Sequence, residues 1–142
     1  MIPVDQIRLG GPNAPLHKRG DCLRACFCSL LELPVDAIPC FHGYNWWNRY
    51  HAALADFSFY PLMVNTDGPL RGYWIADVAS ASYPDVRHAV VMEDDRIVHD
   101  PSPRKLPVEV EYPNEAIILV PFNPLRRVGD EAPMRQLPWE EE

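Results

Sequence analysis

Three side chains in this sequence have the types that a cysteine nucleophile needs: a thiol, an imidazole and a carboxylate. Cys22 follows Asp21, a good helix N-cap, and so stands at the first turn of a predicted helix. Unpaired N–H groups and the helix dipole favour a thiolate at such a position. Cys26 and Cys28 lie further inside the same helix among apolar neighbours, and we expect both in the core. Cys22 is therefore the candidate nucleophile.

A base and an orienting carboxylate are predicted from a hairpin. His88 opens the apolar run 88–92, and Asp100 ends the next run, after a turn at 93–95. With a three-residue loop at this turn, Asp100 stands directly opposite His88, and directly opposed residues have Cβ atoms about 5 Å apart. The carboxylate then holds one imidazole nitrogen while the other faces the thiol. A two- or four-residue loop would shift the register and spoil this pairing.

Each of these residues also has an ordinary structural interpretation. An internal cysteine is usually a small buried hydrophobe, a strand histidine is usually structural, and Asp-Pro usually begins a turn. Chance agreement among a helix-start Cys22 and a hairpin with His88 and Asp100 at matching positions is much rarer, which favours a catalytic triad. His99 should face away from Asp100's side of the strand and is the substitute for His88 if the register differs.

The elements that must position these residues predict an α+β fold. Helical periodicity indicates a helix over about 22–32, which Pro34 ends, one further turn at 35–38, and a second helix from Asn45 to about Asp56. The sequence then changes to short strand-like runs separated by turn residues, at 62–65, 73–79, 88–92, 97–99 and 116–122. Helices first and strands later indicate an antiparallel sheet.

The bulk composition limits the classes of function. The 142 residues are enough for one domain, which we expect over 1–122, followed by a Pro-rich acidic tail over 123–142 that is expected to be partly mobile. The formal net charge of −7 repels phosphate backbones and anionic lipid, so no nucleic acid partner is expected. The sequence has no secretory signal pattern and no run of about 18 apolar residues, which predicts a cytoplasmic protein without membrane contact.

The order of helix-start cysteine, strand histidine and aspartate after a hairpin resembles the papain-like cysteine peptidases. The likeness is greatest to the compact bacteriocin-processing peptidase domains and to small bacterial and phage proteins of that fold. The motifs that carry it are GDCLRAC at 20–26, LLELP at 30–34, HAVV at 88–91 and VHDP at 98–101. The resemblance implies a papain-like fold, with an N-terminal helical lobe bearing Cys22 packed on a C-terminal antiparallel sheet bearing His88 and Asp100.

The resemblance also implies an activity. A cysteine-dependent peptidase, isopeptidase or amidase would act on a protein or peptide through a thioester on Cys22, without a cofactor. Such enzymes have an oxyanion-hole glutamine several residues before the cysteine, where this sequence has Leu16 and His17; the only upstream glutamine is Gln6. If 10–19 bulges out as a loop, Gln6 can return to the site and join the Cys22 backbone N–H; otherwise it is a surface residue near the terminus.

Other interpretations stay open. Trp46 and Trp47 are candidates for lining a substrate cleft, because adjacent residues of one helix cannot both face inward; core and boundary packing is the alternative. A binding protein, phage-encoded and contacting a host or phage protein through its acidic face and this Trp pair, would keep the fold without catalysis. Substrate, oligomeric state and the choice among hydrolysis, deamidation and transamidation are left undecided.

The cysteines suggest neither a disulfide framework nor a metal site. Three of the four fall within seven residues, and cytosolic thiols are normally reduced. Zinc sites pair their ligands as Cys-x₂₋₄-Cys in turns, whereas here Cys26 and Cys28 bracket one helical residue. We therefore expect no metal, although these residues are of the types that zinc prefers: Cys22, Cys26, Cys28, Cys40 and His42.

Overall fold

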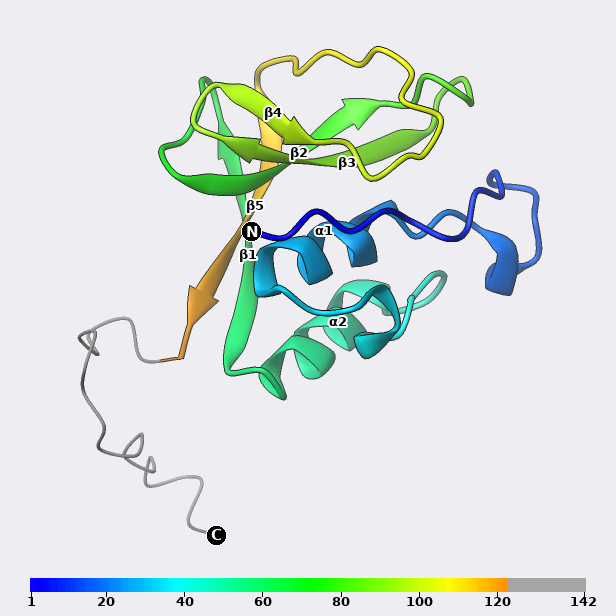
Figure 1. The fold of residues 1–142 in the computed structure, drawn as a ribbon, viewed down its shortest axis with the longest axis horizontal. Coiled ribbons are helices and arrows are strands. Elements are labelled where there is room, and N and C mark those ends of the chain that lie inside the picture. Colours follow the sequence, from blue (N-terminus) through cyan, green and yellow to red (C-terminus); the bar gives the residue numbers. More distant parts are fainter. Residues whose placement is uncertain (123–142) are drawn as a thin grey trace, which may run out of the picture.

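The fold is α+β, as predicted. The structure, a computed structural model, describes residues 1–122, so the tail predicted over 123–142 lies outside the described residues. Two α-helices and a five-stranded antiparallel sheet form the described part of the chain. In Figure 1, the N-terminal segment runs between helix α1 and the hairpin of strands β3 and β4. Within residues 1–122, no helix is long and apolar enough to cross a bilayer.

The helices begin where the sequence predicts and end slightly earlier. Helix α1 spans Cys22–Leu31, and helix α2 spans Trp46–Ala55. Helix α1 ends before Pro34, because Glu32 adopts a left-handed conformation (φ 58°) and Leu33 N–H donates back to the Cys28 carbonyl at 2.9 Å. Short 3₁₀ turns at Leu16–Lys18 and Val35–Ala37 flank α1.

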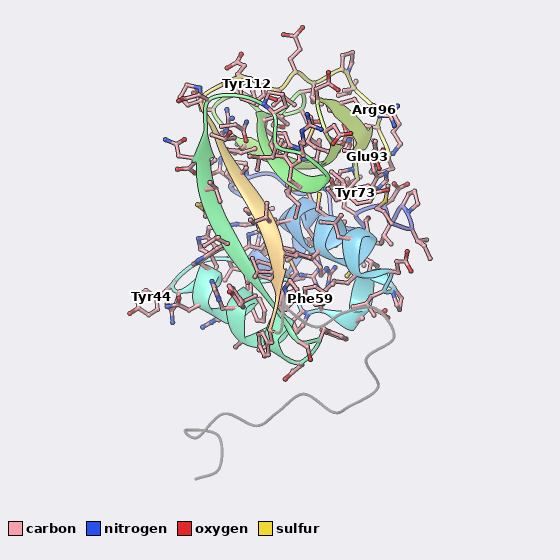
Figure 2. The ribbon with its side chains drawn as sticks, turned by 90° about the vertical axis from the view of Figure 1, so that its left-hand side faces the viewer. Tyr44, Phe59, Tyr73, Glu93, Arg96 and Tyr112 are labelled. Atoms are coloured by element: carbon pink, nitrogen blue, oxygen red, sulfur yellow. The ribbon has the colours of Figure 1, made fainter. Side chains whose placement is uncertain are left out.

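The sheet has the strand order β1-β5-β2-β3-β4. Its strands are β1 (Phe59–Thr66), β2 (Tyr73–Ala79), β3 (Arg87–Glu93), β4 (Arg96–His99) and β5 (Asn114–Pro121). Figure 2 shows the long β1 and β5 side by side, with Tyr73, Glu93 and Arg96 together at the far end of the β3–β4 hairpin. Helix α1 packs on β3, and α2 packs on β1, so the first turn of α1 lies near the start of β3.

The turn of the β3–β4 hairpin has two residues, not the predicted three. Glu93 pairs with Arg96, and Asp94 takes the positive φ of 55° that such a tight turn requires. Continued along both strands, this register would put Asp100 on the opposite face of the sheet from His88, because a one-residue slip turns every side chain over.

A β-bulge restores the side-chain orientation. The register shifts between Val91 and Met92, so that Val91 pairs with His99 instead of Val98. Continued by one residue, this register places Asp100 beside Val90. Because Val90 comes two residues after His88, the side chains of Asp100 and His88 lie on the same face of the sheet. The prediction that Asp100 lies directly opposite His88 was therefore wrong, although the two side chains still meet diagonally.

Both faces of the sheet are covered. On the face that the helices cover, Phe27 of α1 and Tyr50 and Leu54 of α2 pack with Ile75 and Val91 of the sheet. On the other face, Trp74, Ala76, Val78, Val90 and Met92 are buried together with partly buried Val108 and Val110 of the segment that precedes β5. The central strands β2 and β3 are thus held from two sides, which fixes the base of the hairpin that carries His88.

Candidate active site

Asp21 ties the first turn of α1 to the N-terminal segment. The predicted side-chain cap is absent, since the Asp21 carboxylate accepts no hydrogen bond from a backbone N–H of the helix. Its Oδ1 accepts hydrogen bonds from the backbone N–H groups of Ile7 at 3.1 Å and Arg8 at 2.9 Å. Its Oδ2 binds the guanidinium of Arg24, with Nε at 3.2 Å, and both side chains are buried. Asp21 therefore holds the start of α1 against the N-terminal segment through Ile7 and Arg8, and binds α1 itself through Arg24.

Cys22 is the first residue of α1 and is partly exposed. Its backbone N–H donates to no group within residues 1–122, as expected at a first helical position. The thiol thus lies beside an available N–H donor at the positive end of the helix dipole, where negative charge is stabilised.

His88 lies between Asp100 and Cys22. Its Nε2 is 2.7 Å from Asp100 Oδ1, which leaves Nδ1 as the nitrogen available to Cys22. Burial alone would lower the pKa of His88, but hydrogen bonds with Asp100 and Cys22, and their charges, raise it to about 9. Burial raises the pKa of Asp100, but hydrogen bonds from His88 and from Ser102 N–H outweigh that effect and lower it. At neutral pH the arrangement favours an imidazolium next to a carboxylate.

Gln6 is buried and lines the same cleft as Cys22. The loop that separates them in sequence closes at its base, where Gly10 N–H donates to Lys18 at 2.8 Å and Gly20 N–H donates to Gly10 at 2.9 Å. Gln6 Nε2 donates to the Arg8 carbonyl at 2.7 Å and keeps a second hydrogen, while its Oε1 has no partner within the described residues. The condition under which Gln6 returns to the site, a bulging 10–19 loop, is met.

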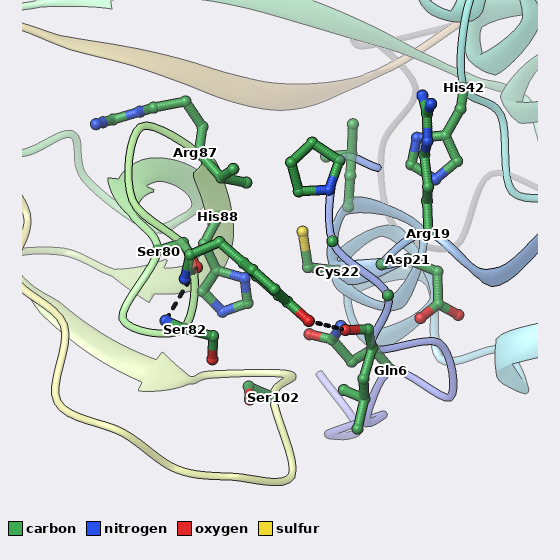
Figure 3. Close-up of a pocket in the computed structure, with 18 of the residues that line it drawn as sticks. Gln6, Arg19, Asp21, Cys22, His42, Ser80, Ser82, Arg87, His88 and Ser102 are labelled. Atoms are coloured by element: carbon green, nitrogen blue, oxygen red, sulfur yellow. Dashed lines mark hydrogen bonds between the residues drawn. The ribbon is translucent and has the colours of Figure 1, made fainter. Parts of the chain in front are cut away.

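The three predicted residues and Gln6 share one cleft of about 400 Å³. Figure 3 shows Cys22 between His88 on one side and Arg19 with His42 on the other. Trp46 lines this cleft and is 38% exposed, whereas Trp47 does not line it and packs against the core. Of the tryptophan pair, the structure brings only Trp46 to the site.

A contact not foreseen from the sequence joins the two lips of the cleft. Tyr83, in the β2–β3 loop, donates its hydroxyl hydrogen to the Leu9 carbonyl at 3.0 Å. Its ring lies so close to Gly11 that a Cβ there would be 2.7 Å from a ring carbon. We call this contact the Tyr83 clasp. No local sequence pattern predicts this contact, because it joins two irregular segments that are far apart in the chain.

Cys26, Cys28 and His99 have structural surroundings. Burial raises the pKa of Cys26, and raises that of Cys28 to about 11. Cys40 Sγ lies 3.4 Å from His42 Nε2, and His99 Nε2 lies 2.8 Å from the Val4 carbonyl, so His99 anchors the N-terminal segment. All four cysteines are free, and residues 1–122 contain no cluster of three or more potential metal ligands.

Comparison of the chain with protein-family models, with curated proteins and with solved structures gave no match.

Proposed function

We propose that the protein is a cysteine-dependent hydrolase of papain-like type that cleaves an amide bond, with a peptide or isopeptide as the preferred substrate. The observation that carries the proposal is the alignment of Cys22, His88 and Asp100 in one open cleft. A thiol at a helix start, an imidazole lining the same cleft and a carboxylate on the far ring nitrogen are the three parts that acyl transfer to sulfur requires.

In the first half of the reaction, the Cys22 thiolate attacks the acyl carbon and the carbonyl electron pair moves to oxygen. The Cys22 N–H and the second amide hydrogen of Gln6 are the donors available to this oxyanion. As the intermediate collapses, the C–N bond breaks and the His88 imidazolium gives its proton to the leaving amine. The products are a thioester on Cys22 and a neutral imidazole.

In the second half, His88 removes a proton from water, and the oxygen of that water attacks the thioester. The C–S bond breaks, the carboxylic acid leaves, and the thiolate–imidazolium pair is restored. Asp100 is not protonated in either half. It keeps the imidazole orientated and favours its charged form.

The layering of the fold supports the papain-like assignment. Cys22 comes from the helical layer, while His88 and Asp100 come from the β3–β4 side of the sheet. The cleft therefore lies between two layers, each of which holds its contribution to the triad rigidly.

The test is the reactivity of Cys22. Iodoacetamide labelling at pH 6.5, followed by peptide mass spectrometry, should find Cys22 alkylated long before the buried Cys26 and Cys28. Because Cys22 is also more exposed, the decisive comparison is with His88→Ala, which should slow Cys22 labelling at this pH about tenfold or more. His51→Ala is the matched control, since His51 packs on Trp47 outside the cleft.

Turnover is tested in a second step. The wild type and Cys22→Ala are incubated with a bacterial lysate, and new peptide termini are compared by mass spectrometry. Termini that require Cys22 support a peptidase. If His88→Ala leaves Cys22 labelling unchanged, the catalytic proposal fails, and a binding protein that retains the cleft becomes the better explanation.

A further inference from the structure

The charges on the walls of the cleft are unequal. Three arginines line it, Arg19 from the lead-in to α1, Arg87 from the start of β3 and Arg104 from the segment after β4. Within the described residues, its acidic lining consists of Asp21 and Asp100.

Both carboxylates are paired with a basic side chain within the protein. Asp21 is buried and accepts from two backbone N–H groups as well as from Arg24. Asp100 Oδ1 binds the imidazole of His88 and accepts from the N–H of Ser102, while its Oδ2 has no protein partner within the described residues. The Arg24 guanidinium offsets the charge of Asp21 and the His88 imidazolium offsets that of Asp100, so the two carboxylates do not cancel the charge of the arginines.

Two of the three arginines keep free donors. Arg87 is compensated by Asp77, whose Oδ1 lies 2.9 Å from Arg87 Nε, and in Figure 3 its guanidinium points away from Cys22. Arg19 uses Nε to bind the Ala14 carbonyl at 3.0 Å, which leaves both terminal nitrogens. The Arg104 side chain has no polar partner within residues 1–122.

This positive lining contrasts with the chain as a whole, whose formal net charge is −7. A cleft of one sign attracts ligands of the other sign, and guanidinium groups bind carboxylates in a two-pronged geometry. Apolar lining from Leu9, Phe41 and Trp46 accompanies the arginines, which suits an extended peptide better than a bare anion.

We propose that the cleft selects an acidic peptide segment, with Asp or Glu side chains near the scissile bond held by Arg19 and Arg104. The inference rests on the proposed function and names its substrate class. The contacts to carboxylates would position the acyl carbon over Cys22, so they should act on turnover as well as on binding.

The experiment uses two pools of randomised decapeptides that differ only in that Asp and Glu in one pool are replaced by Asn and Gln in the other. Turnover by the wild type is followed as amine release. Anisotropy measures binding of labelled pools to Cys22→Ala. We expect the acidic pool to be cleaved about tenfold faster, and this preference to shrink in 0.5 M NaCl because salt screens exposed charges.

Variants locate the effect. Arg19→Gln and Arg104→Gln should each reduce the preference severalfold, and Arg19→Lys should retain much of it because the charge is kept. Arg104→Glu should shift the preference towards Lys-containing peptides. Arg71→Gln is the matched control, since Arg71 is exposed and lies outside the cleft.

The outcomes separate the two proposals. Cys22-dependent cleavage of both pools at equal rates overturns the acidic preference and leaves the hydrolase intact. If neither pool is cleaved, peptide hydrolysis is refuted, and binding to Cys22→Ala decides the acidic preference by itself. Equal binding of both pools, or tighter binding of an oligothymidylate of matched charge, overturns it.

Discussion

The imidazole of His88 is held by two groups that both favour its charged form. Asp100 stays ionised, because its hydrogen bonds lower its pKa, and the Cys22 thiol offers a second anion once it loses its proton. Burial opposes a charged imidazole, yet the pKa of His88 still rises to about 9. An imidazolium at neutral pH is what a thiolate needs beside it, and also what a leaving amine needs as a proton donor.

Gln6 gives the first prediction at this scale. Gln6→Ala should lower kcat about 10²- to 10³-fold with little change in KM, because it removes one of two oxyanion donors. Steady-state kinetics on any peptide that the wild type cleaves measures the effect.

Alkylation separates the catalytic role of Gln6 from a structural one. Iodoacetamide labelling forms no oxyanion, so Cys22 in Gln6→Ala should react at the wild-type rate. Asn65→Ala, an amide removed from an exposed position on β1, should change neither quantity. Wild-type turnover by Gln6→Ala would remove Gln6 from the mechanism.

At the scale of elements, the site depends on how the N-terminal segment, α1 and the β3–β4 hairpin are joined. Asp21 connects the first two, and the contact of His99 with the Val4 carbonyl connects the segment to the hairpin. Gln6 N–H adds a hydrogen bond to the Pro101 carbonyl at 2.9 Å, beside Asp100. The segment that carries the oxyanion candidate is thus held by both elements that carry the triad.

The buried Asp21–Arg24 pair should be sensitive to loss of one member. Asp21→Asn leaves the Arg24 charge buried without a counter-charge, and we expect the free energy of unfolding in urea to fall by about 3–5 kcal/mol. Glu93→Gln breaks an exposed i,i+3 pair with Arg96 and should leave that free energy nearly unchanged. Equal effects of the two substitutions would contradict a structural role for the buried pair.

The sequence was sufficient for the elements but not for their exact registers. Helix starts at Cys22 and Trp46 and the run of five strands follow from periodicity and turn residues, which are local signals. The two-residue turn at Asp94 and the bulge beside Val91 depend on how β3 and β4 pack between the covering layers, and no local pattern sets them. Two departures from the expected hairpin, each shifting the register, together kept His88 and Asp100 on one face.

The place of loop residues in the cleft could also not be predicted from the sequence. Arg104 and Tyr83 lie in irregular segments whose position follows from the folded chain. The triad could be proposed because its members stand at the ends of regular elements, whereas loop contacts between distant segments leave no periodic trace.

For the whole molecule, the raised pKa of His88 predicts how stability depends on pH. The pKa is about 9 in the folded protein and about 6.5 in an unfolded chain. The stabilisation that His88 contributes is therefore fully present below pH 6.5 and is lost as the pH rises through 9.

Thermal unfolding from pH 6 to pH 10 measures this effect. The Tm of the wild type should exceed that of His88→Gln most at pH 6, and the gap should narrow towards pH 10. The same comparison is made between Asp100→Asn and the double variant Asp100→Asn/His88→Gln. Their difference in Tm should change less with pH, because the Asp100 carboxylate is a main cause of the raised pKa of His88. A gap that stays constant with pH would show that folding does not raise the pKa of His88.

The Tyr83 clasp bears on which substrates can reach Cys22. A single hydrogen bond contributes about 1 kcal/mol, and loops open on microsecond to millisecond timescales, often faster than enzyme turnover of about 1–1,000 per second. Opening would then seldom limit the rate. With the clasp closed, however, Leu9 and Tyr83 hold the two sides of the cleft at a fixed separation, so we expect an extended chain to fit the cleft and a folded surface to be excluded.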